Sequence, residues 1–255
     1  MTKRICFVPD LQVPFHDRKA LKAVLRFVGE YQPDEVVQIG DLADFPQPSR
    51  WNKDTRGEFE GSVFADAQEI KRQFLEPLRD VYEGPVGVLE GNHDERPRVY
   101  LDKYAPALSG TRAFDLDVLL DFESYKVDLL PDFYEVAPGW VATHGHKGGI
   151  RLNPNAGYTA MNAAKRFDKS VIMGHTHRLA ALNHTYGYGG DIKKILYGVE
   201  VGNLMSMKQA GYLKGGTANW QQGFAILHVD GNTVRPEVIP ILNRRFIVEG
   251  VTYVI

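Results

Sequence analysis

Five short, mostly apolar runs occur along the chain, and each is followed by a group of polar residues. The runs occupy positions 5–8, 36–39, 86–89, 140–142 and 171–173. Short apolar runs bounded by glycine and polar residues are typical of buried β-strands. We therefore expect five buried strands, each leading into a polar loop.

Helical patterns lie between these runs. In residues 17–31, four apolar side chains follow the spacing of one helix face: Leu21, Val24, Leu25 and Val28. Similar stripes predict helices over residues 59–82, bent at Pro77, and over residues 155–167. Strands that alternate with helices pair in parallel through crossover connections, so the pattern predicts an α/β fold.

The pattern changes after residue 174. Residues 179–222 are rich in glycine and tyrosine, and we expect a loop or lid insertion there. Strand-like segments occur within this stretch at 195–201 and after it at 224–229. Residues 236–255 are rich in β-forming residues and predict a C-terminal β tail, which adds edge strands or contacts a partner.

The composition favours one domain and adds few constraints on function. The chain has 255 residues, 44% of them hydrophobic, so we expect a single domain over residues 1–255. The 30 Lys+Arg nearly balance the 32 Asp+Glu, so no general basic field indicates nucleic acid. Cys6 is the only cysteine, which excludes a disulfide within the chain. Without a signal-peptide core or an apolar run near the roughly 20 residues of a membrane span, we expect a cytoplasmic protein that does not enter the membrane.

The polar groups after the five runs are rich in metal-binding side chains, and five of the eight histidines fall in three of them. Loops at the carboxyl ends of parallel strands meet at one sheet edge, so we expect these groups to converge on one site that suits Mn, Fe or Zn. The groups are Asp10-Leu11-Gln12, Gly40-Asp41-Leu42-Ala43-Asp44, Gly91-Asn92-His93-Asp94, His144-Gly145-His146 and Gly174-His175-Thr176-His177.

Taken singly, these residues have simpler interpretations. Asp10 and Asp44 also suit turns and helix caps. Asp41 is a candidate bridging ligand, because one carboxylate can span two cations about 3.5–4 Å apart. His175 and His177 are two residues apart and point to opposite sides in an extended segment, so each can face a different ion.

Together, the five groups resemble the signature blocks of the calcineurin-like metallophosphoesterase superfamily over residues 4–178. Those blocks read Asp-x-His, Gly-Asp-x-x-Asp, Gly-Asn-His-(Asp/Glu), a His-Gly block and Gly-His-x-His. The resemblance implies two mixed β-sheets packed as a sandwich and flanked by helices. It also implies two divalent metal ions, with Mn as the first candidate and Fe, Zn or Ni as alternatives.

The resemblance further implies roles for the matching residues. The first metal ion would be held by Asp10, Asp41 and His177. The second would be held by Asp41, Asn92, His144 and His175. His93 would act as the catalytic acid near the leaving group, oriented by Asp44, and His146 would contact the substrate or support a ligand.

The first block departs from the family pattern. Gln12 stands where the family has histidine, and a glutamine oxygen binds Mn, Fe or Zn more weakly than imidazole does. His16 lies four residues further on and is an alternative ligand or substrate contact. We keep both interpretations open and expect a first metal site that needs added Mn for saturation.

Positive side chains near the blocks are candidates for binding phosphate. Arg96 and Arg178 flank two of them and suit contacts to phosphoryl oxygens. Arg50 and Trp51 belong to a basic stretch that would suit a phosphate and a stacked base, although an ordinary solvated loop is the interpretation we favour.

The predicted function is hydrolysis of phosphodiester bonds in nucleotides or at nucleic-acid ends, by a water molecule that two metal ions activate. A phosphomonoesterase or protein phosphatase of the same fold is the alternative. The protein-phosphatase branch is less favoured, because Phe45-Pro46 follows Asp44 where that branch has Arg-Gly. A non-catalytic metal-binding scaffold is a further alternative, suggested by Gln12. A Rossmann nucleotide site is excluded, since no Gly-x-Gly-x-x-Gly turn follows the first run. The sequence leaves the oligomeric state open.

Overall fold

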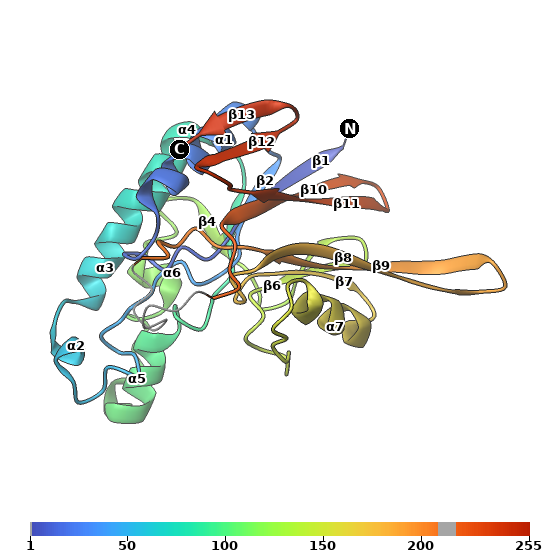
Figure 1. Cartoon of the computed structure of the whole chain (residues 1–255). Helices are drawn as coiled ribbons and strands as arrows, with labels where there is room; N and C mark the ends of the chain where they lie inside the picture. Colours follow the sequence, from blue (N-terminus) through green and yellow to red (C-terminus); the bar gives the residue numbers. More distant parts are fainter. Residues whose placement is uncertain (1, 209–217) are drawn as a thin grey trace.

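Two β-sheets form the centre of the computed structural model, which describes residues 2–208 and 218–255 (Figure 1). The first sheet has the strand order β11-β10-β1-β2-β3-β4. Its strands are β1 (Lys3–Val8), β2 (Glu35–Gln38), β3 (Val86–Val88), β4 (Val127–Leu129), β10 (Gly223–Asp230) and β11 (Thr233–Pro240). The four strands β1 to β4 pair in parallel, which confirms the pairing expected from alternating strands and helices. β10 and β11 add an antiparallel edge.

The second sheet has the order β5-β6-β7-β9-β8. Its strands are β5 (Tyr134–Ala137), β6 (Trp140–Thr143), β7 (Ser170–Met173), β8 (Leu179–Tyr188) and β9 (Asp191–Val201). β6, β7 and β9 run in parallel, whereas β8 and β9 form a long antiparallel hairpin. Figure 1 shows this hairpin extending away from the rest of the molecule. It occupies much of the segment where we expected a loop or lid at 179–222, and residues 209–217 of that segment lie outside the described residues.

Alternating side chains of the strands divide the interior into separate cores. Cys6 and Val8 of β1 belong to a core shared with the helices, and Ile5 and Phe7 belong to a core shared with the second sheet. This division follows from the two-residue period of a strand, which sends successive side chains to opposite faces. The two mixed sheets therefore pack as a sandwich with apolar residues on both faces of β1, as the family resemblance implied.

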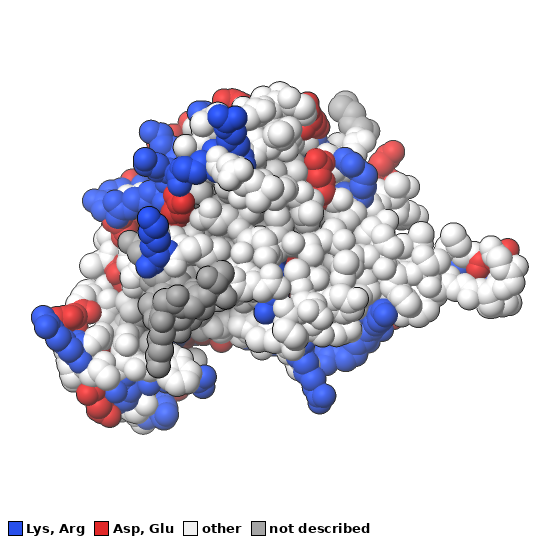
Figure 2. Space-filling view, in the orientation of Figure 1, with Lys and Arg blue, Asp and Glu red and all other residues white. Residues whose placement is uncertain are grey.

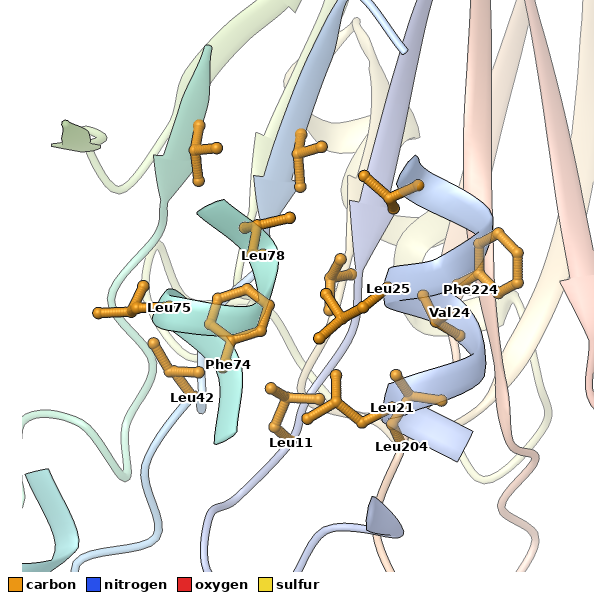
Figure 3. Close-up of a cluster of buried hydrophobic side chains, with 14 of the residues drawn as sticks. Leu11, Leu21, Val24, Leu25, Leu42, Phe74, Leu75, Leu78, Leu204 and Phe224 are labelled. Carbon is orange, nitrogen blue, oxygen red and sulfur yellow. The ribbon is translucent and has the colours of Figure 1, made fainter. Parts of the chain in front are cut away.

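Helices cover the outer faces and complete four layers. The first sheet is covered by α1 (Arg18–Tyr31), α3 (Val63–Ile70), the π-helix η1 (Lys71–Leu75), α4 (Glu76–Val81) and α6 (Leu116–Leu119). Figure 3 shows Leu21, Val24 and Leu25 of α1 beside Phe74 and Leu78 in the same apolar layer. On the second sheet, α7 (Tyr158–Phe167) contributes Ala160, Ala163 and Ala164. The remaining helices are α2 (Arg56–Phe59), α5 (Arg96–Tyr104) and the 3₁₀ turn η2 (Pro106–Leu108).

The helix predicted over residues 17–31 is confirmed. Asp17 caps α1, since its side chain accepts hydrogen bonds from the backbone N–H groups of Lys19 and Ala20, both at 3.1 Å. These contacts satisfy two of the N–H groups that lack a partner at the start of a helix. The cap fixes the point where the loop from β1 enters α1.

The helix predicted over residues 59–82 is confirmed over residues 63–81, but it begins later than expected and contains a π-turn. α2 ends at Phe59, and the long helical segment begins at Val63. Within that segment, η1 separates α3 from α4 just before Pro77. Proline has no N–H group for the helical ladder, and a π-turn is one way for a helix to accommodate the missing bond.

The C-terminal β tail folds back onto the same chain. Strands β12 (Arg245–Val248) and β13 (Val251–Val254) form a two-stranded antiparallel sheet. Phe246 and Tyr253 pack against Phe27 of α1, with ring centroids 6.0 and 5.3 Å from it. The hairpin thus extends the core between α1 and the first sheet.

The surface in Figure 2 carries both signs of charge. Lys and Arg side chains gather in the region where Figure 1 draws α1 and α4, and the middle of this face has few charged side chains. Among the described helices, none combines the length and apolar content that a membrane crossing requires.

Candidate metal and active site

The five polar groups identified in the sequence follow β1, β2, β3, β6 and β7 at their carboxyl ends. Parallel neighbours within each sheet bring these loops together, and the sandwich brings the two sets of loops to the same edge. Residues as far apart in the sequence as Asp10 and His175 therefore come into contact. The His175 backbone N–H donates to both Asp10 carboxylate oxygens, at 3.2 and 3.0 Å.

Two groups of potential metal ligands share Asp41. In the first group, ligand atoms of Asp10, Asp41 and His177 all lie within 4.8 Å of one another. In the second, the same holds for Asp41, His144 and His175. Distances of this size suit donors around one small cation at about 2.0–2.2 Å from each ligand atom. The arrangement brings together the ligands that the resemblance assigned to two ions, with Asp41 common to both.

Asn92 and the backbone complete the second group. Asn92 Oδ1 lies 3.2 Å from His144 Nε2. His144 Nδ1 lies 3.0 Å from the Ile39 carbonyl oxygen, so Nδ1 carries the proton that it donates there. This contact orients the ring so that Nε2 points toward Asp41 Oδ1, 3.4 Å away. A neutral imidazole held this way presents the lone pair that a metal ion requires.

The electrostatics of the site favour a cation. Burial alone would raise the pKa of Asp41, yet the His144 and His93 imidazoles hold it well below its usual range. Burial opposes protonation of His144, but the Asp41 and Asp10 carboxylates raise its pKa to about 9. Burial, reinforced by His144, lowers the pKa of His175 to about 4. A divalent ion would replace the His144 proton as the partner of Asp41, so binding would release a proton.

Four residues of the site adopt the left-handed backbone region, which residues other than glycine rarely occupy. Gln12, Asp41, His175 and His177 have φ angles of 49°, 51°, 67° and 56°. Such backbone strain is concentrated at functional sites in proteins, where the surrounding structure enforces it. The fold thus holds these loops in the conformations that turn the side chains inward.

Gln12 and His16, the two candidates for the ligand that is histidine in the family pattern, lie in different surroundings. Gln12 Nε2 lies 3.3 Å from both Asp41 Oδ2 and His177 Nε2, while its buried Oε1 has no hydrogen-bond partner. Rotation of the amide by 180° would direct this oxygen at the same point, as a ligand requires. His16 is buried beside Arg18 and Glu69, and it does not line the pocket described below.

His93 forms a dyad with Asp44. His93 Nδ1 lies 2.7 Å from Asp44 Oδ1, and the His93 backbone N–H donates to Asp41 Oδ1 at 2.8 Å. Arg96 contacts both members, through the Asp44 carbonyl oxygen at 2.5 Å and His93 Nε2 at 3.1 Å. Although burial opposes it, the carboxylates of Asp41 and Asp44 raise the pKa of His93. The dyad therefore presents an imidazole that retains a proton readily beside the ligands.

Asp94 has a structural part that the sequence did not reveal. Its buried carboxylate accepts hydrogen bonds from the backbone N–H groups of Gly91, Ala43 and Leu42, at 2.8, 2.8 and 3.3 Å. It thereby ties the loop after β2 to the loop after β3. Burial, together with the nearby Asp41 charge, raises the pKa of Asp94 to about 7. Only its place in the Gly-Asn-His-Asp group hinted at this function.

Glu200 supports the His175 and His177 loop from behind. This fully buried carboxylate on β9 accepts from the Thr176 hydroxyl at 3.0 Å. It also accepts from the backbone N–H groups of Thr159 and Ala160 at the start of α7, at 3.0 and 3.3 Å. Glu200 therefore fixes the residue between the two histidines of the candidate ligand groups. No local motif marks it, because its partners come from other elements.

A pocket of about 850 Å³ opens over the ligands. It is lined by Gln12, Asp41, His175 and His177 of the metal site and by the neighbouring Asp44, His93 and Arg96. A slightly larger hollow of about 960 Å³ runs along α1 and is lined by none of these residues. The chemistry of the lining therefore makes the smaller pocket the candidate active site.

Two further residues predicted to contact substrate lie outside the described lining of this pocket. His146 is adjacent to His144, with ring centroids 5.3 Å apart, but its Nε2 lies 3.3 Å from a Glu95 carboxylate oxygen. Arg178 donates to the Asn153 carbonyl oxygen at 2.8 Å. Both side chains are thus engaged by neighbouring loops, whereas Arg96 reaches the pocket.

Comparison with known proteins gives the same family on independent grounds. A family model described as calcineurin-like phosphoesterase matches residues 3–179. The chain is 57% identical over 251 residues to the Gene 54 proteins of Mycobacterium phage L5 and Mycobacterium phage D29, and each match covers 98% of both chains. Among solved structures, Vacuolar Protein Sorting 29 from Cryptosporidium parvum matches 99% of this chain and 98% of its own, at 16% identity and a TM-score of 0.48.

Proposed function

Because the chain belongs to the calcineurin-like phosphoesterase family, we propose that it hydrolyses phosphodiester bonds of nucleotides or nucleic-acid ends with two divalent metal ions bound. The observation that supports this most directly is the pair of ligand groups that share Asp41. Mn is the metal we propose first, since carboxylate, amide and imidazole donors occur together.

Metal ions held at Asp41 would supply charge for the phosphoryl oxygens and lower the pKa of the attacking water. The residues around them orient the substrate and move a proton. Arg96 binds a phosphoryl oxygen, since its guanidinium lies in the same pocket as the ligands. His93 donates a proton to the leaving oxygen, because an alkoxide is a poor leaving group without one.

The contact between Arg96 and His93 links these two roles. An Arg96 N–H that donates to His93 Nε2 requires that atom to be unprotonated. When Arg96 turns to a phosphoryl oxygen instead, Nε2 becomes free to carry the proton, while Nδ1 keeps its contact with Asp44. Substrate binding and protonation of the acid are thereby coupled in this proposal.

Hydrolysis of bis-p-nitrophenyl phosphate with added Mn, Ni, Fe or Zn tests the activity. We expect turnover in the presence of Mn and a higher kcat/KM for this diester than for p-nitrophenyl phosphate. A preference for the monoester would favour the phosphomonoesterase alternative. An absence of turnover with all four metals, in a protein that binds them by calorimetry, would favour the non-catalytic scaffold that Gln12 suggests.

Gln12→His restores the family residue and is expected to tighten metal binding at the Asp10 site by about tenfold, since imidazole is the stronger ligand. Mn titration by isothermal calorimetry measures this change as a lower Kd for the weaker of the two sites. His16→Gln is the matched control, and it should leave both metal affinities unchanged. The assignment of Gln12 fails if His16→Gln weakens metal binding and Gln12→His has no effect.

A further inference from the structure

The pocket is much larger than a phosphoryl group requires. Its volume of about 850 Å³ lies in the range of about 300–1,000 Å³ that is typical of sites for small organic molecules. Beyond the metal ligands, its wall contains Phe15, Pro46, Trp51, Met205 and Trp220. An aromatic and apolar wall next to metal ligands fits a substrate with a flat, partly apolar group attached to its phosphate.

Trp51 lines this pocket, although most of its side chain is in solvent. Its exposed fraction is 75%, and the Arg50 guanidinium lies 4.6 Å from the ring centroid. An indole ring binds flat π-systems through its face, and a guanidinium over an aromatic ring is favourable. The ring therefore offers aromatic surface to a ligand, and not to the apolar core of the protein.

The loop that carries Trp51 is held in place by its own hydrogen bonds. Asn52 Nδ2 donates to the Pro46 carbonyl oxygen at 2.7 Å, and the Asn52 backbone N–H donates to the Ser49 carbonyl oxygen at 2.9 Å. On the far side, Lys53 pairs with Glu58 at 2.6 Å. A loop fixed in this way holds an exposed tryptophan in position, so less conformational entropy is lost when a ligand binds it.

Trp51 lines the same pocket as the dyad that would protonate the leaving group. Asp44, which orients His93, is followed directly by Phe45, Pro46 and the loop that bears Trp51. Asp44, His93, Pro46 and Trp51 all line the same pocket. A group that leaves with the proton from His93 would therefore leave into the pocket that Trp51 also lines.

We propose that Trp51 is the specificity-determining residue for a nucleobase and stacks on the base of the departing nucleoside. This assignment rests on the proposed phosphodiesterase function and narrows its substrate to diesters whose leaving group carries a base. It replaces the solvated loop that the sequence alone favoured for this stretch. Arg50 covers one face of the indole, and the base would stack on the other face.

The test compares the dinucleotide d(ApA) with two versions that each lack one of the two bases, because product analysis then shows which nucleoside leaves. We expect kcat/KM to fall when the departing nucleoside lacks its base. Trp51→Ala should lower the ratio of kcat/KM with and without that base by about tenfold, which is the size expected for one stacked base. Trp51→Phe should retain most of it, since a smaller aromatic ring still stacks.

Phe59→Ala is the matched control. Phe59 is 78% exposed and belongs to the neighbouring α2, but it does not line the pocket. This variant should keep the wild-type preference. The proposal is overturned if Trp51→Ala lowers kcat/KM equally for substrates with and without the base, or if it changes neither.

A binding measurement separates failure of this inference from failure of the proposed function. The fluorescence of 2-aminopurine nucleoside monophosphate reports stacking without any turnover. We expect Trp51→Ala to weaken its binding by about tenfold and Phe59→Ala to leave it unchanged. Binding that depends on Trp51 without hydrolysis of any diester would support the base site and contradict the hydrolase. Hydrolysis of diesters, together with nucleotide binding that is unchanged in Trp51→Ala, would support the hydrolase and contradict the base site.

Discussion

Asp41→Ala is expected to abolish binding of both metal ions and to lower phosphodiester hydrolysis by about 10³-fold or more. The magnitude corresponds to losing several kcal/mol of charge stabilisation, at about 1.4 kcal/mol per factor of ten. Asp41 is the one carboxylate that belongs to both ligand groups, so no other single substitution should affect both ions equally. Mn titration by isothermal calorimetry, with kcat/KM on bis-p-nitrophenyl phosphate, measures both effects.

Two further variants make this result specific. Asp41→Asn keeps the shape of the side chain and an oxygen that accepts the hydrogen bond from the His93 backbone N–H, but it removes the negative charge. It should therefore fold like the wild type and still lose metal. Asp128→Ala, an exposed aspartate on β4, should change neither affinity nor activity. Two Mn ions bound to Asp41→Ala with wild-type affinity would contradict the shared-ligand arrangement.

His93→Ala is expected to lower kcat by about 10²–10⁴-fold on diesters with an alkoxide leaving group, which is the usual contribution of a general acid. Metal binding should persist, because the hydrogen bond from His93 to Asp41 is donated by the backbone N–H, which alanine retains. The side chain acts from the Asp44 dyad and not from the ligand groups. Steady-state kinetics and metal titration on the same protein measure the two properties.

Leaving-group dependence distinguishes an acid from a structural residue. On bis-p-nitrophenyl phosphate, the leaving p-nitrophenolate needs little protonation. His93→Ala should therefore lower kcat much less on this substrate than on a dinucleotide. Asp44→Asn should show the same pattern with a smaller loss, since it disturbs only the orientation of His93. Equal losses of kcat on both substrates would contradict the assignment of His93 as the general acid.

Much of the fold could be read from the spacing of apolar residues. The strand at residues 5–8 and the helix at 17–31 are confirmed by β1 and α1, because strand alternation and helical spacing are local properties. The helix predicted over 59–82 begins later than expected, at Val63, and ends at Val81. Its stripe of apolar residues continues through η1, and this π-turn lies just before Pro77, where the sequence predicted a bend.

The sequence by itself determined which side chains are available for metal binding and in which order, because each group sits at the end of its own strand. It also determined the family, since the five groups recur in a fixed order. The tertiary structure decided which of these side chains meet. It turned Gln12 toward Asp41 and His16 away, engaged Arg178 with the Asn153 loop, and placed Glu200 behind Thr176. These contacts join residues far apart in the chain, and they depend on loops whose backbone adopts left-handed conformations. Long-range contacts and strained backbone angles leave no local pattern in the sequence.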